Sequence, residues 1–374
     1  MKVRRYDIDW IRVIVFDILI FWHVGLYFVL WESHVDWDLP LKNNVQVSWL
    51  SWPMLFVRQW RLPILFVISG IGTRFALSSR TAFQYIRERN IRLLLPLMAG
   101  VLLLVPPMVY LERKLQGAME VSYWSFYPGF FKGFYPEGNF SWHHLWFLAY
   151  LFLMSMIALP LFLYLRRSGR KVFAFLSRSI RKTPFSLYVL AIPLIIVQLT
   201  LENKYPLTMA LVDDWYAFNY YLLCFISGFI LASLGEQGWK AMMDIRCISL
   251  FLGLSASLVV LIMIHRGENP AWMQILKPLN CWSWIMAIFG YASKYLNKNG
   301  VLLRYRNTAV YPFYIIHFTI LVSLGYLIIN HSMHYVWKMV IMLFGTYGIS
   351  FILYEFFISR IKFLRPIFGL KNRS

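Results

Sequence analysis

Charged residues are scarce in this sequence of 374 residues, where they occupy 14% of the positions while hydrophobic residues occupy 59%. A soluble globular domain carries charge at about 25% of its positions, so the composition argues against a soluble fold. No internal repeat and no stretch polar enough for a separate soluble domain is visible. We therefore expect a single membrane-embedded domain over residues 1–374.

Cysteine is also rare, and Cys224, Cys247 and Cys281 lie in or beside apolar runs. Three thiols in such positions do not indicate a disulfide framework or a zinc site, and the eight histidines contain no HExxH pattern. We expect neither disulfides nor a metal site. Acidic residues are few too, which leaves a net charge of +20. Because the basic residues alternate with apolar runs, the charge favours a membrane and not a nucleic acid as partner.

Long apolar runs are what the sequence has in quantity. A helix needs about 20 mainly apolar residues to cross a bilayer, and the runs predict about ten such helices. They lie near residues 11–31, 49–73, 93–111, 144–165, 184–201, 216–235, 247–265, 276–293, 307–329 and 335–358. The predicted fold class is an all-α, polytopic membrane protein. Most lysines and arginines fall on the side that holds both chain ends, so both termini are predicted to be cytoplasmic.

Several predicted spans contain ionisable residues, which are costly in hydrocarbon unless they are paired or functional. Arg12 and His23 are eleven residues apart in the first span. In a helix this spacing puts them on nearly the same face and roughly 16 Å apart. Arg306 and His317 repeat the spacing. Each pair offers a guanidinium that can hold phosphate at the cytoplasmic end and a deep imidazole that can act as a general base.

Simpler roles for these residues stay open. Arg12 and Arg306 also fit ordinary positive-inside anchors, and the deep histidines also fit hydrogen-bonded residues of the bundle core. Arg89 and Arg92, in the segment RERNIRLLLP, fit either a solvated cytoplasmic loop or a site for the anionic head of a donor. Spacing alone does not decide between these roles.

Six segments, in this order, resemble the acyltransferase 3 superfamily of membrane acyltransferases and, within it, the glucans biosynthesis protein C branch. They are RRYDIDWIRVIVFDILIFWHVG at 4–25, RLPILFVISG at 61–70, RERNIRLLLPL at 87–97, HHLWFLAYLF at 143–152, YPFYIIH at 311–317 and LYEFFISR at 353–360. Each segment alone is a weak apolar string. Their common order over nearly the whole chain makes the resemblance specific.

The resemblance implies a membrane O-acyltransferase of the inner (plasma) membrane. Such an enzyme moves an acyl group, acetyl or succinyl, from cytoplasmic acyl-CoA to a hydroxyl of a carbohydrate or lipid-linked glycan. The family's Arg-x10-His, Ser-Gly, Arg-x-x-Arg and His-Leu-Trp-Phe elements fall on Arg12 and His23, on Ser69 and Gly70, on Arg89 and Arg92, and on His144, Leu145, Trp146 and Phe147. We therefore expect the catalytic residues to be His23, Arg12 and His317, and the substrate-binding residues to be Ser69, Gly70, Arg61, Arg89, Arg92, His144 and Trp146.

In this interpretation His23 deprotonates the acceptor hydroxyl or carries the acyl group covalently. Arg12, Arg89 and Arg92 hold the CoA phosphates, and Ser69–Gly70 lets backbone and donor approach closely. No permanently bound cofactor is expected, because acyl-CoA is a substrate. The alternative is a transporter or flippase of an acylated or anionic lipid-linked saccharide, which would also need charged residues within a helix bundle. A purely structural membrane protein is a third possibility, which the intramembrane charges disfavour.

Overall fold

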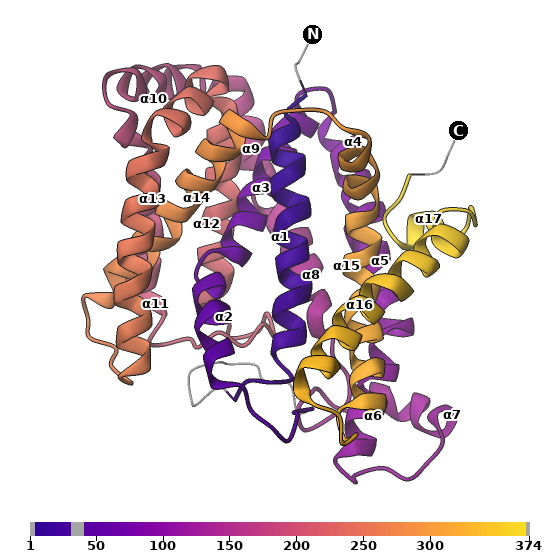
Figure 1. Cartoon of the computed structure of the whole chain (residues 1–374). Helices are drawn as coiled ribbons and strands as arrows, with labels where there is room; N and C mark the ends of the chain where they lie inside the picture. The colour runs from indigo at the N-terminus through magenta and orange to yellow at the C-terminus, as the bar shows by residue number, and fades with distance from the viewer. Residues whose placement is uncertain (1–3, 31–40, 372–374) are drawn as a thin grey trace. The chain divides into compact units, whose positions relative to one another are not determined.

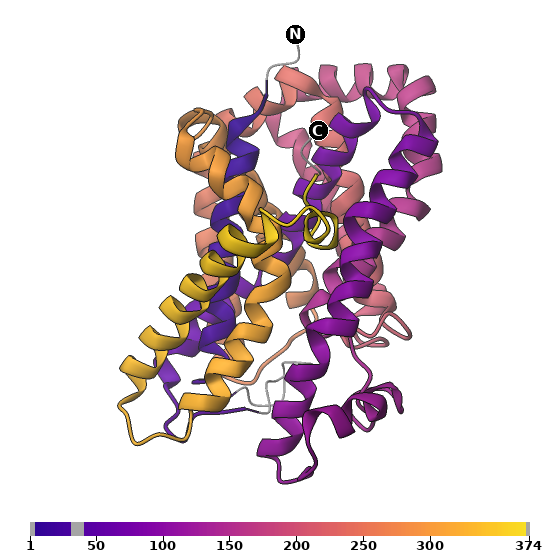
Figure 2. The same ribbon diagram turned by 90° about the vertical axis from the view of Figure 1, so that its right-hand side faces the viewer.

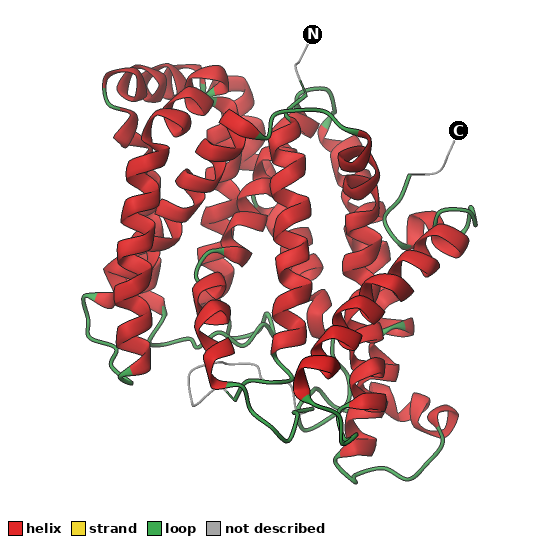
Figure 3. Ribbon diagram, in the orientation of Figure 1, coloured by secondary structure: helices red, strands yellow, loops and turns green. Residues whose placement is uncertain are grey.

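A computed structural model describes residues 4–30 and 41–371, and in these ranges the elements are helices joined by loops (Figure 3). The prediction of an all-α protein is thereby confirmed. The α-helices are α1 (Tyr6–Gly25), α2 (Ser51–Arg58), α3 (Arg61–Leu77), α4 (Ala82–Arg89), α5 (Leu95–Leu103), α6 (Val105–Leu115), α7 (Tyr123–Phe126), α8 (Trp146–Ile157), α9 (Leu159–Ser168), α10 (Arg170–Lys182), α11 (Ile192–Leu201), α12 (Trp215–Ser233), α13 (Gly235–His265), α14 (Met273–Tyr295), α15 (Val301–Ile328), α16 (Tyr335–Leu353) and α17 (Leu364–Ile367).

Seven helical segments are long and apolar enough to cross a membrane, and the described chain is thus a multi-pass membrane protein. They are Ser48–Leu77, Ala82–Leu115, Pro184–Leu201, Trp215–Ser233, Gly235–His265, Val301–Ile328 and Tyr335–Ile358. An eighth span forms if His143–Ile157 and Leu159–Ser168, bent by 45° at their junction, count as one. Each of these segments overlaps one of the predicted spans.

The two other predicted spans, 11–31 and 276–293, are helical as α1 and α14 but are not among these segments. The reason lies in their polar residues. Asp9, Arg12 and Asp17 make α1 too charged, and Lys277 is among the polar residues that lower the mean hydropathy of α14. Residue 31 itself lies outside the described residues. The structure therefore supports seven or eight spans by length and composition, and the count of about ten stays a prediction.

The chain divides into two compact units, and each unit is assembled from three separate stretches of sequence. Unit 1 consists of Met1–Val15, Trp52–Ile86 and Leu153–Asn307, and unit 2 of Phe16–Ser51, Arg87–Phe152 and Thr308–Ser374. The boundaries fall inside α1, α2, α4, α8 and α15, so these helices contribute residues to both units. The expectation of one domain over residues 1–374 stays a prediction.

Unit 1 contains two closely packed helix pairs, α3 with α12 and α13 with α14 (Figure 1). Glycines make the first contact possible. A Cβ atom at Gly70 of α3 would overlap the carbonyl oxygen of Phe225 in α12, and one at Gly228 would overlap that of Val67. Small residues let membrane helices bring their backbones together where no hydrophobic force drives association. The two helices are thus held at a distance that larger side chains would not permit.

Unit 2 contains the second half of α1 together with α5, α6, α16 and most of α15. In Figure 2, α15 and α16 run side by side, and a Cβ atom at Gly345 of α16 would lie 2.9 Å from the side chain of Leu324 in α15. The hydroxyl of Tyr347 in α16 donates a 2.9 Å hydrogen bond to the carboxylate of Asp17 in α1. An ionisable residue of α1 is thus satisfied within this unit.

Candidate functional site

Three histidines from distant parts of the sequence lie together in unit 2. Nδ1 of His23, in α1, is 3.0 Å from Nε2 of His317, in α15. The ring of His144 lies edge-on to that of His317, with centroids 5.3 Å apart. All three side chains are buried, and Phe318 contacts the rings of both His23 and His144. The structure therefore brings together two residues predicted to be catalytic and one predicted to bind substrate.

Hydrogen bonds assign the proton on each ring of the His23–His317 pair. Nδ1 of His317 lies 2.7 Å from the carbonyl oxygen of Tyr314, and because a carbonyl only accepts, this nitrogen carries the hydrogen. In a neutral imidazole the other nitrogen then has the lone pair. Nε2 of His317 therefore accepts, and Nδ1 of His23 donates. It follows that Nε2 of His23 carries a lone pair and is the basic atom of the pair.

His144 follows the same rule with a different result. Its Nε2 lies 3.0 Å from the carbonyl oxygen of Ile315 and must donate, which leaves the lone pair on Nδ1. This atom is buried and has no hydrogen-bond partner among residues 4–30 and 41–371. A buried polar atom left in this state costs about 1–3 kcal/mol, and such atoms usually bind water or a ligand. Nδ1 of His144 is thus suited to accept a hydrogen bond from a substrate.

The segment with Arg89 and Arg92 is joined to the same helix as His317. Arg89 ends α4, and Arg92 lies in the following π-helical turn, Asn90–Leu94. Tyr311 of α15 donates its hydroxyl to the backbone carbonyl of Arg92 over 2.5 Å. Tyr311 and Tyr314 stack with ring centroids 6.4 Å apart. Residues at successive turns of α15 thus lead from the arginine segment to the histidines.

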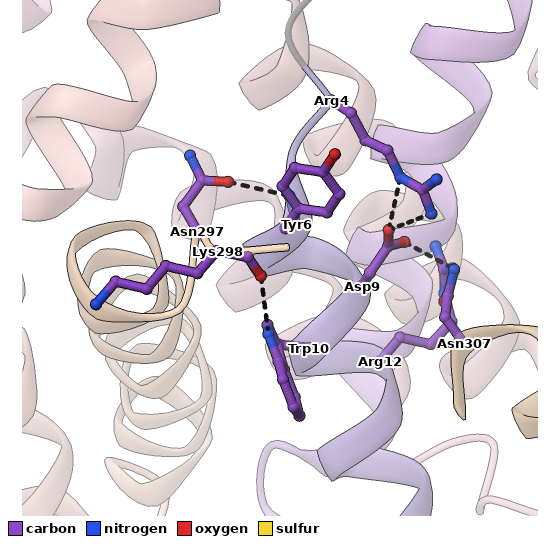
Figure 4. Close-up of polar contacts among 8 residues, drawn as sticks. All are labelled: Arg4, Tyr6, Asp9, Trp10, Arg12, Asn297, Lys298 and Asn307. Carbon is purple, nitrogen blue, oxygen red and sulfur yellow. Dashed lines mark hydrogen bonds and ion pairs between the residues drawn. The ribbon is translucent and has the colours of Figure 1, made fainter. Parts of the chain in front are cut away.

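Arg12 belongs to unit 1 and lies in a cluster of ionic contacts (Figure 4). Its Nη1 is 2.9 Å from the amide oxygen of Asn307 and 3.4 Å from a carboxylate oxygen of Asp9. Arg4 donates two hydrogen bonds, of 3.1 and 2.8 Å, to the other oxygen of Asp9. The carboxylate therefore offsets charge on both arginines at the start of α1.

Arg61, Ser69 and Gly70, predicted to bind substrate, all lie on α3 in unit 1. Arg61 is buried at the first turn, with 3% of its surface exposed. The hydroxyl of Ser69 donates to the carbonyl of Leu65 in the same helix over 2.8 Å. Gly70 is where the backbone of α12 approaches, as described above. In the structure its missing side chain thus serves helix packing, and a contact with the donor stays a prediction.

Residues 5–355 match the family model described as an acyltransferase domain, acyltransferase 3. The chain belongs to this family. Curated relatives include glucans biosynthesis protein C of Salmonella typhimurium (strain LT2), which is 23% identical over 98% of this chain and 95% of the relative. The protein of the same name from Escherichia coli O157:H7 is 24% identical with the same coverage. No solved structure matches. The resemblance drawn from the sequence segments is confirmed, and the chain is an acyl-transferring membrane enzyme.

Tyr314, which the sequence pattern did not single out, is hydrogen-bonded to two of the three histidines. Tyr314 donates its hydroxyl to the backbone carbonyl of His144 over 2.6 Å, and its own carbonyl accepts from His317. It thereby fixes two of the three histidines. Its position one helical turn before His317, within the segment YPFYIIH, was the one feature of the sequence that could have pointed to this residue. The other predicted binding residue, Trp146, is 7% exposed and lies edge-on to Tyr150 with centroids 5.0 Å apart.

A metal ion would need several ligand side chains gathered in one place. Within residues 4–30 and 41–371, no group of three or more histidine, cysteine, aspartate or glutamate side chains is arranged to hold a metal ion. Four imidazole nitrogens of the cluster are instead engaged with one another or with backbone carbonyls: Nδ1 of His23, both nitrogens of His317 and Nε2 of His144.

Proposed function

We propose that this acyltransferase moves an acetyl or succinyl group from cytoplasmic acyl-CoA to a hydroxyl of a carbohydrate or lipid-linked glycan. The observation that carries the proposal is the His23–His317 pair, in which the hydrogen bonds leave the lone pair on Nε2 of His23. The names of the relatives, which refer to glucans biosynthesis, support a glucan as acceptor. About ten membrane spans, cytoplasmic termini and a place in the inner (plasma) membrane belong to the same proposal.

In the proposed reaction, Nε2 of His23 removes the proton of the acceptor hydroxyl as the oxygen attacks the thioester carbonyl of the donor. The new C–O ester bond forms, the C–S bond breaks, and the proton on His23 passes to the departing CoA thiolate. During the reaction His23 becomes an imidazolium ion, which Nε2 of His317 stabilises by accepting from its Nδ1. His317 in turn is held by the Tyr314 carbonyl. A positioned general base of this kind contributes about 10²–10⁴ to a rate.

The donor would be bound through its phosphates. Arg89 and Arg92 lie in the unit that contains the histidine cluster, and guanidinium groups form strong, directional hydrogen bonds with phosphate oxygens. The binding roles predicted for Arg12, Arg61, Ser69 and Gly70 in unit 1 remain part of the proposal. Family membership favours acyl transfer over the transporter or flippase alternative.

The proposal is tested with the purified protein in detergent, supplied with acetyl-CoA or succinyl-CoA labelled in the acyl group and with gluco-oligosaccharides. The label is expected in an ester of the oligosaccharide, and free CoA should be released in an equal amount. Omission of the oligosaccharide distinguishes two routes, because only a covalent intermediate would then leave label on the protein. If neither donor transfers label to any gluco-oligosaccharide, the proposed donor and acceptor pair is wrong.

Topology requires its own test, because the donor must reach its site from the cytoplasm. Single cysteines would replace Lys182, at the end of α10, and Asp213, in the loop before α12, in a variant without the native cysteines. The Asp213→Cys protein should react with an impermeant thiol reagent in intact cells, and the Lys182→Cys protein only after permeabilisation. Reaction of both from outside would contradict the orientation and a cytoplasmic donor.

A further inference from the structure

The loop in front of His144 is tied to the last turn of α6 at several points within unit 2. Arg113 of α6 donates to the carbonyl oxygens of Pro136 over 2.5 Å and of Gly138 over 2.8 Å. Its Nε also donates to the side-chain oxygen of Asn139 over 3.3 Å. One guanidinium thus holds three residues of this loop at the end of a helix.

Glu112, the neighbour of Arg113, is a buried carboxylate with 8% of its surface exposed. It accepts a 2.9 Å hydrogen bond from the hydroxyl of Tyr135, and its other oxygen lies 4.0 Å from Nε2 of His143. The pKa of Tyr135 is raised, first by burial and then by Glu112, so the hydroxyl stays protonated and donates. A buried carboxylate is costly without such partners. Both partners belong to the segment that leads into His144.

His143 has an unusual backbone conformation at this point. Its φ of 43° lies in the left-handed region, which residues with a side chain rarely adopt and which persists only where the surroundings hold it. Ser141 accepts from the backbone N–H of His143 over 3.0 Å and contacts its Nδ1 at 2.7 Å. The ring of Tyr135 lies against that of His143, with centroids 5.3 Å apart. The conformation of His143 sets the direction in which the chain enters His144.

From these contacts we infer that Glu112 is a positioning residue for the acceptor side of the site. Through Tyr135 and His143 it fixes the backbone before His144, and this keeps Nε2 of His144 on the Ile315 carbonyl. The Nδ1 lone pair is then presented to a hydroxyl of the acceptor. This inference rests on the proposed function for its ligand, and it names the acceptor, not acyl-CoA, as the substrate affected.

Kinetics of graded variants test the inference. Glu112→Ala removes both contacts and should raise the KM for gluco-oligosaccharide about tenfold, the effect of one charge-assisted hydrogen bond. Glu112→Gln can still accept from Tyr135 and should raise it less. The KM for acyl-CoA should stay within about twofold, because the arginine segment is untouched. The matched control is Glu120→Ala, which replaces an exposed glutamate in the loop between α6 and α7 and should change neither constant.

Equal rises in both KM values, or an equal effect of Glu120→Ala, would overturn the positioning role. Tyr135→Phe, which loses only the donor to Glu112, replaces the alanine variant if that protein does not fold.

Hydrogen–deuterium exchange gives a readout that needs no turnover. Glu112→Ala should speed exchange of the backbone amides of residues 135–147 and leave those of α16 unchanged, while Glu120→Ala should change neither. Unchanged exchange in 135–147 would show that Glu112 does not hold the loop, whatever the enzyme acylates. If the wild-type protein transfers no acyl group, the proposed function is wrong. The exchange measurement still shows in that case whether Glu112 holds the loop before His144. Faster exchange with an unchanged KM for the oligosaccharide would show that Glu112 holds the loop, but it would contradict a role in binding the acceptor.

Discussion

The two halves of α1 hold their polar side chains in opposite ways. In the half that belongs to unit 1, Arg12 lies beside Asp9, whose carboxylate also accepts two hydrogen bonds from Arg4. In the half that belongs to unit 2, His23 donates to a neutral ring, that of His317. A carboxylate stabilises the protonated form of a base, so a histidine paired in the manner of Arg12 would keep its proton. The pairing of His23 suits a group that must take up a proton and release it.

The largest expected effect on acyl transfer comes from replacing His23, in the half of α1 that belongs to unit 2. His23→Ala should lower acyl transfer about 10²–10⁴-fold, because the proposed general base is lost. Binding of acyl-CoA, measured by isothermal titration, should survive. His331→Ala is the control, since His331 is exposed beyond the end of α15. A His23 variant that keeps more than about a tenth of the wild-type rate would be too active for this mechanism.

His317→Ala should have a smaller effect, roughly 10–100-fold on turnover, by analogy with the loss of groups that orient metal-binding histidines. The variant leaves the His23 ring in place but removes the acceptor of its Nδ1–H. The ring can then carry its proton on either nitrogen, so only a fraction of molecules present the base. Turnover would be measured with saturating acyl-CoA. A loss as large as that of His23→Ala would mean that His317 itself takes part in the proton transfer.

Replacement of Arg89 or Arg92 by Ala tests the donor end and should raise the KM for acyl-CoA roughly tenfold. Each charge-assisted contact with a phosphate is worth about 1.5–3 kcal/mol. Arg87→Ala, in the same basic segment, is the control for a general change of charge. An unchanged KM for acyl-CoA in folded variants would mean that Arg89 and Arg92 do not bind the donor and belong to a solvated cytoplasmic loop.

The smallest effect on acyl transfer is expected from replacing Asp9, in the half of α1 that belongs to unit 1. Asp9→Asn removes the charge opposite Arg4 and Arg12, and a partly exposed ion pair contributes only about 0–1 kcal/mol. Thermal unfolding should shift by a few degrees, and acyl transfer should change less than about twofold. A loss of transfer comparable to that of His317→Ala would mean that Asp9 itself is needed for the reaction, and it would remove the contrast between the two halves of α1.

The sequence predicted the helices better than their arrangement. Run length alone located most of the membrane helices, because about 20 apolar residues are both necessary and recognisable. The predicted span 11–31 stays a prediction, because charged side chains such as Arg12 and Asp17 keep α1 out of the segments that are apolar enough to cross a membrane. The two interleaved units have no local signature, since hydropathy does not report which helices pair.

The candidate site shows the same limit. The spacing of Arg12 and His23, together with its repeat at Arg306 and His317, singled out the two histidines that turn out to be hydrogen-bonded. The contact of His144 with the Ile315 carbonyl joins positions 171 residues apart. No periodicity connects such positions, so only the resemblance marked His144. The roles of Glu112 and His143 depend on loop geometry and could not be predicted from composition or spacing.

The continuity of α1 from Tyr6 to Gly25 has a consequence for how such chains can change in length. Inserting or deleting one residue between Arg12 and His23 would turn one of them by about 100° relative to the other and shift it by about 1.5 Å along the axis. A single indel would therefore move His23 away from His317, which is held on another helix. Relatives that diverge in length should place their gaps in the loops and keep this interval constant.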